Sequence, residues 1–332
     1  METASIAMAA GLSFLITWLS GKWLIPWLKK LKFGQKILED GPVWHMAKQN
    51  IPTMGGILFI LGISVATIGI CVVRDDPNQV DYLVVLLMAL CFGFIGFIDD
   101  FTKVVKKRNK GLSAPQKLIL QVAISVVCLT SFRINGTLDP VLQIPFTSFE
   151  IELNWWVYVA FCVFIIVGAV NAVNLTDGLD GLVTSVTLPV AILFTAAFLI
   201  LYNYPMAVLG AALAGGLIGF LIYNFYPAKA FMGDTGSLFL GGMVCGLAFA
   251  LNFPLLLAPL GIIYIVEALS VILQVGYFKL THGKRLFKMA PLHHHFEMKG
   301  YRETQIVLAA TLISLLAAVA AFVALLMNYK LI

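Results

Sequence analysis

Ten apolar runs dominate this chain, and each is about as long as the roughly 17–25 residues that a helix needs to cross a bilayer. They lie at residues 4–28, 53–73, 81–98, 116–131, 155–173, 181–201, 205–223, 236–252, 255–279 and 304–329. Hydrophobic residues make up 60% of the sequence, charged residues only 12%, and the mean hydropathy is +0.94, which exceeds what soluble domains show. We therefore expect an all-α polytopic membrane protein with ten transmembrane helices, forming a single integral-membrane domain over residues 1–332.

The distribution of Lys and Arg predicts how the chain is oriented. The connections after the odd-numbered runs carry most of these residues, whereas the opposite side has only Arg74, Arg133 and Lys330. The positive-inside rule then places the odd connections in the cytoplasm and both termini outside. The longest outer connection, "RINGTLDPVLQIPFTSFEIEL", combines an Asn-Gly turn signal with alternating strand residues, which predicts a small outer β-hairpin.

The conspicuous polar segments all fall on the cytoplasmic side. They are "KQNIPTMGG" (48–56), "IDDFTK" (98–103), "NAVNLTDGLDG" (171–181), "YNFYPAKAFMGDTGS" (223–237) and "APLHHHFEMKG" (290–300). Each segment carries different polar chemistry, and this concentration on one side favours a composite active site on the cytoplasmic face of the membrane.

Asp99 and Asp100 are adjacent carboxylates at the expected end of the third span. A helix C-terminus disfavours anions, and neighbouring carboxylates raise each other's pKa, so two energetic penalties coincide. One explanation is a solvated ion cluster in which Lys103 and Lys107 neutralise the pair. The other is that the pair binds a divalent cation or takes part in proton transfer.

Two further cytoplasmic segments carry acidic or amide side chains. Asn171, Asn174, Asp177 and Asp180 recur every three residues and would share one face of a helix end; helix capping would explain one or two of them but hardly all four. Asp234 in "FMGDTGS" is either the N-cap of the eighth span or a magnesium ligand beside a phosphate held at the helix N-terminus.

Aromatic and basic side chains in the same connections suit a nucleotide ligand. Phe231 is either an interfacial aromatic residue or a platform on which a nucleobase stacks. The consecutive residues His293, His294 and His295 would point in different directions on a regular backbone, which suits phosphate binding better than one zinc ion. The alternative for this basic loop is attraction to anionic lipid headgroups.

In this order and between these spans, the motifs resemble the bacterial phospho-N-acetylmuramoyl-pentapeptide transferase family, within the polyprenyl-phosphate N-acetylhexosamine-1-phosphate transferase superfamily. "KQNIPTMGG" and "NLTDGLDGL" are similar to its two signature segments, and "DDFTK", "FMGDTGS" and "PLHHHFE" are similar to its other cytoplasmic motifs. The resemblance covers essentially the whole chain. It implies a magnesium-dependent enzyme that transfers phospho-N-acetylmuramoyl-pentapeptide from its UDP carrier to undecaprenyl phosphate, giving lipid I and UMP for peptidoglycan and cell-wall synthesis.

The resemblance also implies roles for individual residues. The catalytic candidates are Asp99, Asp100, Asp234 and His294, with Asp234 the expected magnesium ligand and Asp99 and Asp100 further candidate ligands. The substrate-binding candidates are Lys48, Thr53, Lys117, Asn174, Asp177, Asp180, Asn224, Phe231, His293 and His295. The partners implied are the UDP-linked donor, undecaprenyl phosphate and the lipid bilayer of the bacterial plasma membrane, with no nucleic acid. The oligomeric state stays open, with a homodimer as one alternative.

Two other functions and two reaction routes remain as alternatives. A UDP-N-acetylglucosamine:polyprenyl-phosphate N-acetylglucosamine-1-phosphate transferase would share most motifs, but "PLHHHFE" is of the muramoyl type. A cation-coupled transporter should show acidic residues at mid-bilayer and an internal repeat, whereas only Glu267 lies deep in a run and it has no assigned role. Direct attack of the lipid phosphate on the β-phosphate is favoured over a two-step route through an aspartyl phosphate.

Overall fold

The computed structural model describes residues 2–30, 48, 51–74, 79–105 and 111–331. Its elements in chain order are α1 (Glu2–Lys30), α2 (Gly56–Arg74), α3 (Gln79–Val105), α4 (Ala114–Ile134), β1 (Val141–Gln143), β2 (Glu150–Glu152), α5 (Trp155–Thr176), α6 (Leu182–Ile200), α7 (Tyr204–Asn224), α8 (Gly233–Ala250), the 3-10 helix η2 (Pro254–Leu256), α9 (Leu257–Leu260), α10 (Ile262–Leu280), α11 (Leu292–Glu297) and α12 (Glu303–Asn328). In this described part, ten helices are long and apolar enough to cross a membrane. The ten expected spans are therefore confirmed, and the chain is a multi-pass membrane protein.

The helices pack around α8, which is the most enclosed of the ten. Of its most apolar stretch, 89% is buried inside the protein, and its closest neighbours are α3 and α5. Glycines allow this close packing: a Cβ on Gly96 of α3 would overlap the main chain of Asp234, and one on Gly56 of α2 would overlap Gly236. Such close approach is typical of membrane helices. The hydrophobic effect does not drive helices together in lipid, so they associate through van der Waals packing, which small residues permit.

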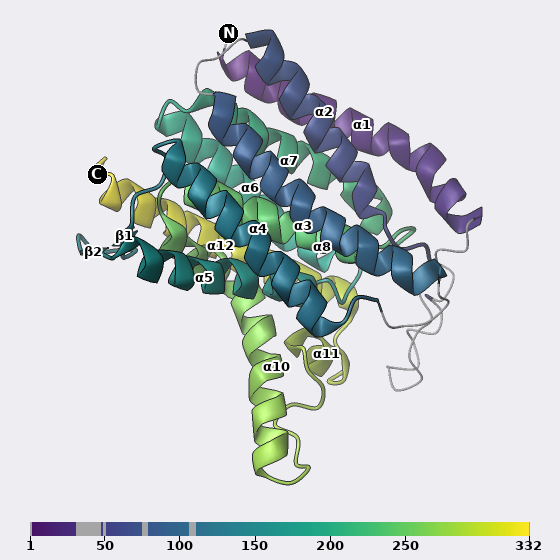
Figure 1. The fold of residues 1–332 in the computed structure, drawn as a ribbon. Helices are drawn as coiled ribbons and strands as arrows, with labels where there is room; N and C mark the ends of the chain where they lie inside the picture. The colour runs from purple at the N-terminus through teal and green to yellow at the C-terminus, as the bar shows by residue number, and fades with distance from the viewer. Residues whose placement is uncertain (1, 31–47, 49–50, 75–78, 106–110, 332) are drawn as a thin grey trace.

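The predicted hairpin is present in the connection between α4 and α5, but the Asn135-Gly136 pair ends α4 and does not form the hairpin turn. β1 and β2 pair antiparallel, with Val141 opposite Glu152 and Gln143 opposite Glu150. In Figure 1 the hairpin and the C-terminal end of α12 lie together at one end of the helix bundle. At that end the Tyr329 hydroxyl donates to the carbonyl oxygen of Leu251, just beyond the C-terminus of α8. The N-terminus of α8, with Asp234, therefore lies at the opposite end of the bundle.

Two helices differ from the expected spans. The ninth apolar run is not one helix, because η2 and α9 precede a break at Gly261 and only then does α10 begin. Pro259 lacks the amide hydrogen that a continuous helix would need at this point. α10 then extends away from the bundle, with α11 beside it (Figure 1). The third span also continues beyond the Asp99–Asp100 pair to Val105, so the pair lies inside a helix rather than at its last residue.

Candidate active site

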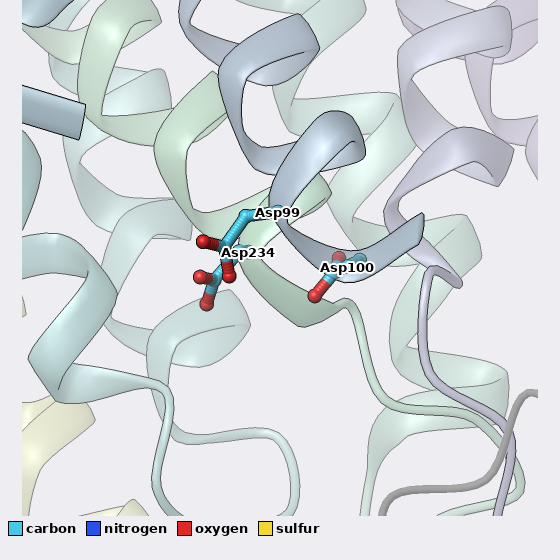
Figure 2. A group of neighbouring side chains, drawn as sticks. All are labelled: Asp99, Asp100 and Asp234. Atoms are coloured by element: carbon cyan, nitrogen blue, oxygen red, sulfur yellow. The ribbon is translucent and has the colours of Figure 1, made fainter. Parts of the chain in front are cut away.

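Three carboxylates converge where the C-terminal part of α3 meets the start of α8. Asp99, Asp100 and Asp234 each offer an oxygen atom, and these oxygens lie within 4.8 Å of one another. Figure 2 shows the Asp99 and Asp234 side chains close together and the Asp100 side chain farther along the turn of α3, because successive residues on a helix are turned about 100° apart. Carboxylate oxygens are the ligands that a hard divalent cation such as Mg²⁺ prefers, so this group could hold one.

Two lysine ammonium groups connect these carboxylates. Lys103 Nζ lies 2.7 Å from Asp99 Oδ2, 3.3 Å from Asp234 Oδ2 and 3.9 Å from Asp100 Oδ1. Lys117, in the first turn of α4, lies 2.9 Å from Asp234 Oδ2. The expected pairing of the aspartates with Lys103 is confirmed, whereas Lys107 lies outside the described residues. Unlike a solvated surface cluster, however, Asp99 and Asp100 are only 4% and 1% exposed.

Main-chain and hydroxyl donors hold the two α3 carboxylates in place. Asp99 Oδ1 accepts a hydrogen bond from the main-chain N–H of Leu112 at 2.8 Å. Asp100 Oδ2 accepts from both the N–H and the hydroxyl of Thr235, at 2.9 and 2.8 Å. Asp100 Oδ1 is buried and accepts no hydrogen bond from the described residues. An acceptor left in this way is costly unless a ligand or cation occupies it.

Asp234 does not cap its helix. The N-cap of α8 is Met232 and makes no side-chain capping bond, while Asp234 stands in the first turn. Asp234 Oδ1 instead accepts from Asn174 Nδ2 at 2.9 Å, and the same amide donates to the Ser237 hydroxyl at 2.8 Å. The capping alternative for Asp234 is therefore wrong, and its carboxylate faces the acidic cluster.

Asp177, the C-cap of α5, adds a fourth carboxylate to this region. Burial raises the pKa of its carboxyl well above the usual range, and the neighbouring charges of Asp234, Asp100 and Asp180 raise it further. No described residue makes a hydrogen bond or ion pair with the carboxyl group of Asp177. Without a cation, these surroundings favour the protonated form of Asp177, whereas a divalent cation among the carboxyl groups would favour the ionised form. The residues present fit a magnesium ion, which Asp234, Asp99 and Asp100 could hold.

A second charged cluster joins four segments of the chain. Lys48 Nζ lies 2.7 Å from both Asp180 Oδ1 and Glu303 Oε2. Asp180 Oδ2 accepts from the N–H of Ala228 at 2.9 Å, and Glu303 Oε2 accepts from the N–H of Asp180 at 3.3 Å. Burial alone would lower the pKa of Lys48, but the hydrogen bonds and charges of Asp180 and Glu303 outweigh it and raise that pKa. Lys48 therefore remains an ammonium group at neutral pH.

The predicted residues of the polar segments at 48–56 and 223–237 differ in whether their side chains already have hydrogen-bond partners. Asn224 is engaged at both ends, accepting from Thr184 at 2.8 Å and donating to the Ala230 carbonyl at 3.1 Å, so it shapes the loop. Thr53 has a buried hydroxyl without a partner among the described residues. Phe231 is half-buried, and its main chain is hydrogen-bonded to Pro52 and Gly55 at 2.9 and 2.8 Å. Its ring therefore stands on a fixed backbone.

The three consecutive histidines point to three different partners. His293 Nδ1 lies 3.1 Å from Glu267 Oε2, and His294 Nδ1 lies 2.6 Å from Glu297 Oε2. His295 Nδ1 accepts from the N–H of Lys288 at 3.1 Å. Burial, followed by the charges of Lys299 and Lys288, lowers the pKa of His295. As expected, the three rings do not converge on one point. The His295 ring faces the main chain of Lys288.

The sequence alone missed Glu303 and left Glu267 without a role. Glu303 is the first residue of α12, and an acidic residue there is also explained by the helix dipole, so nothing marked it as a partner of Lys48. Glu267 carried one usable signal: an acidic residue deep in an apolar run needs a polar partner. The structure identifies that partner as His293.

Family comparisons agree with this geometry. The family model described as Glycosyl transferase family 4 matches residues 82–252, which contain all three carboxylates of the cluster. The bundle of membrane-spanning helices and this match define a multi-pass membrane transferase. A second model, phospho-N-acetylmuramoyl-pentapeptide-transferase signature 1, matches residues 48–60, which include Lys48 and Thr53.

Curated relatives narrow the class further. A protein of Caldanaerobacter subterraneus subsp. tengcongensis is 47% identical over 96% of this chain and 98% of its own length. Relatives from Desulforamulus reducens and Listeria monocytogenes serotype 4b are 44% and 42% identical, over 95% and 96% of this chain and 94% and 98% of their own lengths. All three are named phospho-N-acetylmuramoyl-pentapeptide-transferase. The chain belongs to the phospho-N-acetylmuramoyl-pentapeptide-transferase family.

Proposed function

We propose that this protein transfers phospho-N-acetylmuramoyl-pentapeptide from UDP-N-acetylmuramoyl-pentapeptide to undecaprenyl phosphate, giving lipid I and UMP. The observation that carries the proposal is the buried cluster of carboxylates and lysines, found on a chain that matches relatives of this name over nearly its whole length. The N-acetylglucosamine-1-phosphate transferase is not favoured, because the relatives and the signature at residues 48–60 both carry the muramoyl name.

The proposal also covers the location and orientation of the enzyme in the membrane. We place residues 1–332 as one domain in the bacterial plasma membrane, with both termini outside and the carboxylate cluster at the cytoplasmic surface. Three features support this orientation: the Lys and Arg asymmetry of the connections, the cluster at one end of the bundle, and the hairpin at the other. A lipid phosphate at headgroup level and a soluble nucleotide sugar can both reach such a site.

The cluster supplies the charge neutralisation that phosphoryl transfer needs. Asp234, Asp99 and Asp100 would hold Mg²⁺, which when bound neutralises phosphate oxygens and stabilises charge that develops during transfer. Lys103 and Lys117 stand beside the same carboxylates and can donate hydrogen bonds to phosphate oxygens. Positioning and electrostatic stabilisation, rather than a strong base, would then account for most of the rate.

We favour a single displacement. An oxygen of the lipid phosphate forms a bond to the β-phosphorus of the donor while the bond from that phosphorus to the bridging oxygen breaks, and UMP leaves with that oxygen. A phosphate monoester has a second pKa near about 6, so the attacking group is already largely ionised. Asp99 would position the lipid phosphate or accept its remaining proton.

The remaining predicted residues would form the donor side of the site. Lys48 and Asp180 belong to the cluster that joins four segments, and the main chain of Phe231 is hydrogen-bonded to the segment that follows Lys48. Stacking of the uracil on Phe231 and ionic contacts of Lys48 with the diphosphate would orient the donor. Thr53 and His294 stay in this assignment as substrate-binding and catalytic proposals, respectively.

The direct test is a donor comparison with purified protein, undecaprenyl phosphate and Mg²⁺. We expect a new lipid product and stoichiometric UMP with UDP-N-acetylmuramoyl-pentapeptide, and neither with UDP-N-acetylglucosamine. A lipid product formed only from UDP-N-acetylglucosamine would contradict the proposed substrate. Omission of Mg²⁺, with EDTA added, should abolish both products.

Replacement of Phe231 by Ala should weaken donor binding. Stacking of a base on an aromatic ring is worth about 1–3 kcal/mol, so the donor KM should rise roughly 5- to 150-fold. The KM for undecaprenyl phosphate should change little, since the lipid has no base to stack. Steady-state kinetics with each substrate varied in turn would measure this, and an unchanged donor KM would make Phe231 only an interfacial aromatic residue.

Replacement of Glu303 by Gln should weaken donor binding, because it removes one of the ionic partners of Lys48. The amide keeps a hydrogen-bond acceptor but removes one of the two negative charges that hold the Lys48 ammonium group. We expect the donor KM to rise on the order of 10-fold, as for lost charge-assisted contacts, with a smaller change in kcat. Glu152→Gln, an exposed residue of the hairpin, is the matched control. Equal kinetics in the two variants would show that Glu303 only stabilises the fold.

A further inference from the structure

Glu267 is a buried acidic residue of α10 that the proposed reaction does not use. Its side chain is 9% exposed, and the His293 side chain that it contacts is fully buried. Glu267 Oε2 lies 3.3 Å from the main-chain nitrogen of His293 and 3.1 Å from its Nδ1. Both groups of one histidine therefore converge on a single carboxylate oxygen.

This arrangement defines the state of the His293 ring. A carboxylate can only accept hydrogen bonds, so the ring nitrogen facing it, Nδ1, carries a proton. The second hydrogen bond, from the main-chain N–H, fixes the start of α11 against α10 and removes freedom of the ring to rotate away. The ring is therefore held in one orientation, with Nε2 as its outer end.

Nε2 of His293 points to the turn that joins α5 to α6. A Cβ placed on Gly178 would overlap this atom, so the ring edge lies directly against the turn, and only glycine allows this approach. The same turn carries Asp177, which faces the acidic cluster, and Asp180, which binds Lys48. Nε2 is buried and has no hydrogen-bond partner among the described residues. A buried ring nitrogen in this state is completed by a ligand or by water.

We propose that Glu267 is a positioning residue: it fixes the tautomer and orientation of His293, whose buried Nε2 edge packs against Gly178 and so holds the 177–181 turn in place for the donor substrate. This inference rests on the proposed function, because it assumes that the turn belongs to the donor side. Glu267 itself does not touch the substrate, and all of its effect on the reaction passes through His293. Glu267 lies on α10, which projects from the bundle (Figure 1). Its contact with His293 links this helix to the turn beside the carboxylate cluster.

A purely structural contact between α10 and α11 is the competing explanation, and a double-mutant cycle separates the two. The variants are Glu267→Gln, His293→Gln and the double variant, with Glu150→Gln in the exposed hairpin as the control. We expect Glu267→Gln to lower kcat/KM for the donor about 10- to 100-fold, as for the outer partners of other functional histidines. The KM for undecaprenyl phosphate should stay within about twofold, and the control should match the unmodified protein.

The double variant should have the same donor kcat/KM as His293→Gln alone. The effects of two substitutions that act through one group do not add. Multiplicative effects, or unchanged donor kinetics in Glu267→Gln, would overturn the proposal. A second measurement needs no variant at Glu267: ¹⁵N-histidine NMR of the unmodified protein should show His293 with its proton on Nδ1, assigned by the signal lost in His293→Gln. A ring protonated only on Nε2 would also overturn it. If the unmodified protein transfers nothing, the proposed function fails, whereas the NMR result still decides the His293 tautomer.

Discussion

Asp234→Asn should give a folded, membrane-inserted protein whose turnover is reduced on the order of 10²-fold or more and whose magnesium requirement is raised. The amide keeps the shape and one oxygen of the side chain but removes the negative charge that a hard dication requires. It also presents an N–H donor to groups that themselves only donate: Lys103 and Lys117 lie 3.3 and 2.9 Å from Asp234 Oδ2. The measurements are initial rates across a Mg²⁺ titration, together with thermal unfolding in detergent.

The control for Asp234→Asn is Glu150→Gln, which removes a carboxylate of the exposed hairpin at the other end of the bundle. It should leave turnover and magnesium dependence unchanged. Normal turnover and magnesium dependence in Asp234→Asn would remove the metal from this part of the site. A large loss of thermal stability would instead show that Asp234 holds α3, α4 and α8 together, because a buried network that loses one charge is strongly destabilised.

The membrane architecture was predictable because apolar runs of spanning length report directly on helices in a bilayer. All ten expected spans have a matching helix, and the hairpin lies in the predicted connection. Its turn falls between Gln143 and Glu150, however, whereas Asn135 and Gly136 end α4. The prediction of one continuous helix for the ninth span was wrong. Its sequence contained the reason, Pro259 followed by Gly261, but hydropathy counts such residues as part of an apolar run and does not register the missing hydrogen bond.

The site was predictable as a set of residues but not as a set of contacts. One-sided polar segments identified Asp99, Asp177 and Asp234, and the structure brings them together. The pairing of Lys48 with Glu303 could not be predicted, because Glu303 is 255 residues away and the contact depends on how α12 packs. Tertiary contacts between charged groups follow no local period, so sequence patterns carry little information about them.

Gly96→Ala tests whether the close packing of α3 and α8 sets the spacing of the carboxylates. A Cβ at residue 96 would overlap the main-chain carbonyl of Asp234 and come within 2.6 Å of the Thr235 nitrogen. Because these are backbone atoms, the two helices must separate, which typically costs about 1–3 kcal/mol of stability.

The same separation should weaken the site, because Asp99 and Asp100 lie on α3 while Asp234 lies on α8. We expect Gly96→Ala to lower the thermal midpoint and to reduce turnover on the order of 10²-fold, since a misplacement of about 1 Å can cost that much. The matched control is Gly69→Ala in α2, where an added Cβ meets nothing within 4 Å. It should keep full activity and stability. If Gly96→Ala loses stability but keeps normal turnover, the carboxylates tolerate the helix shift, and their spacing does not depend on this glycine.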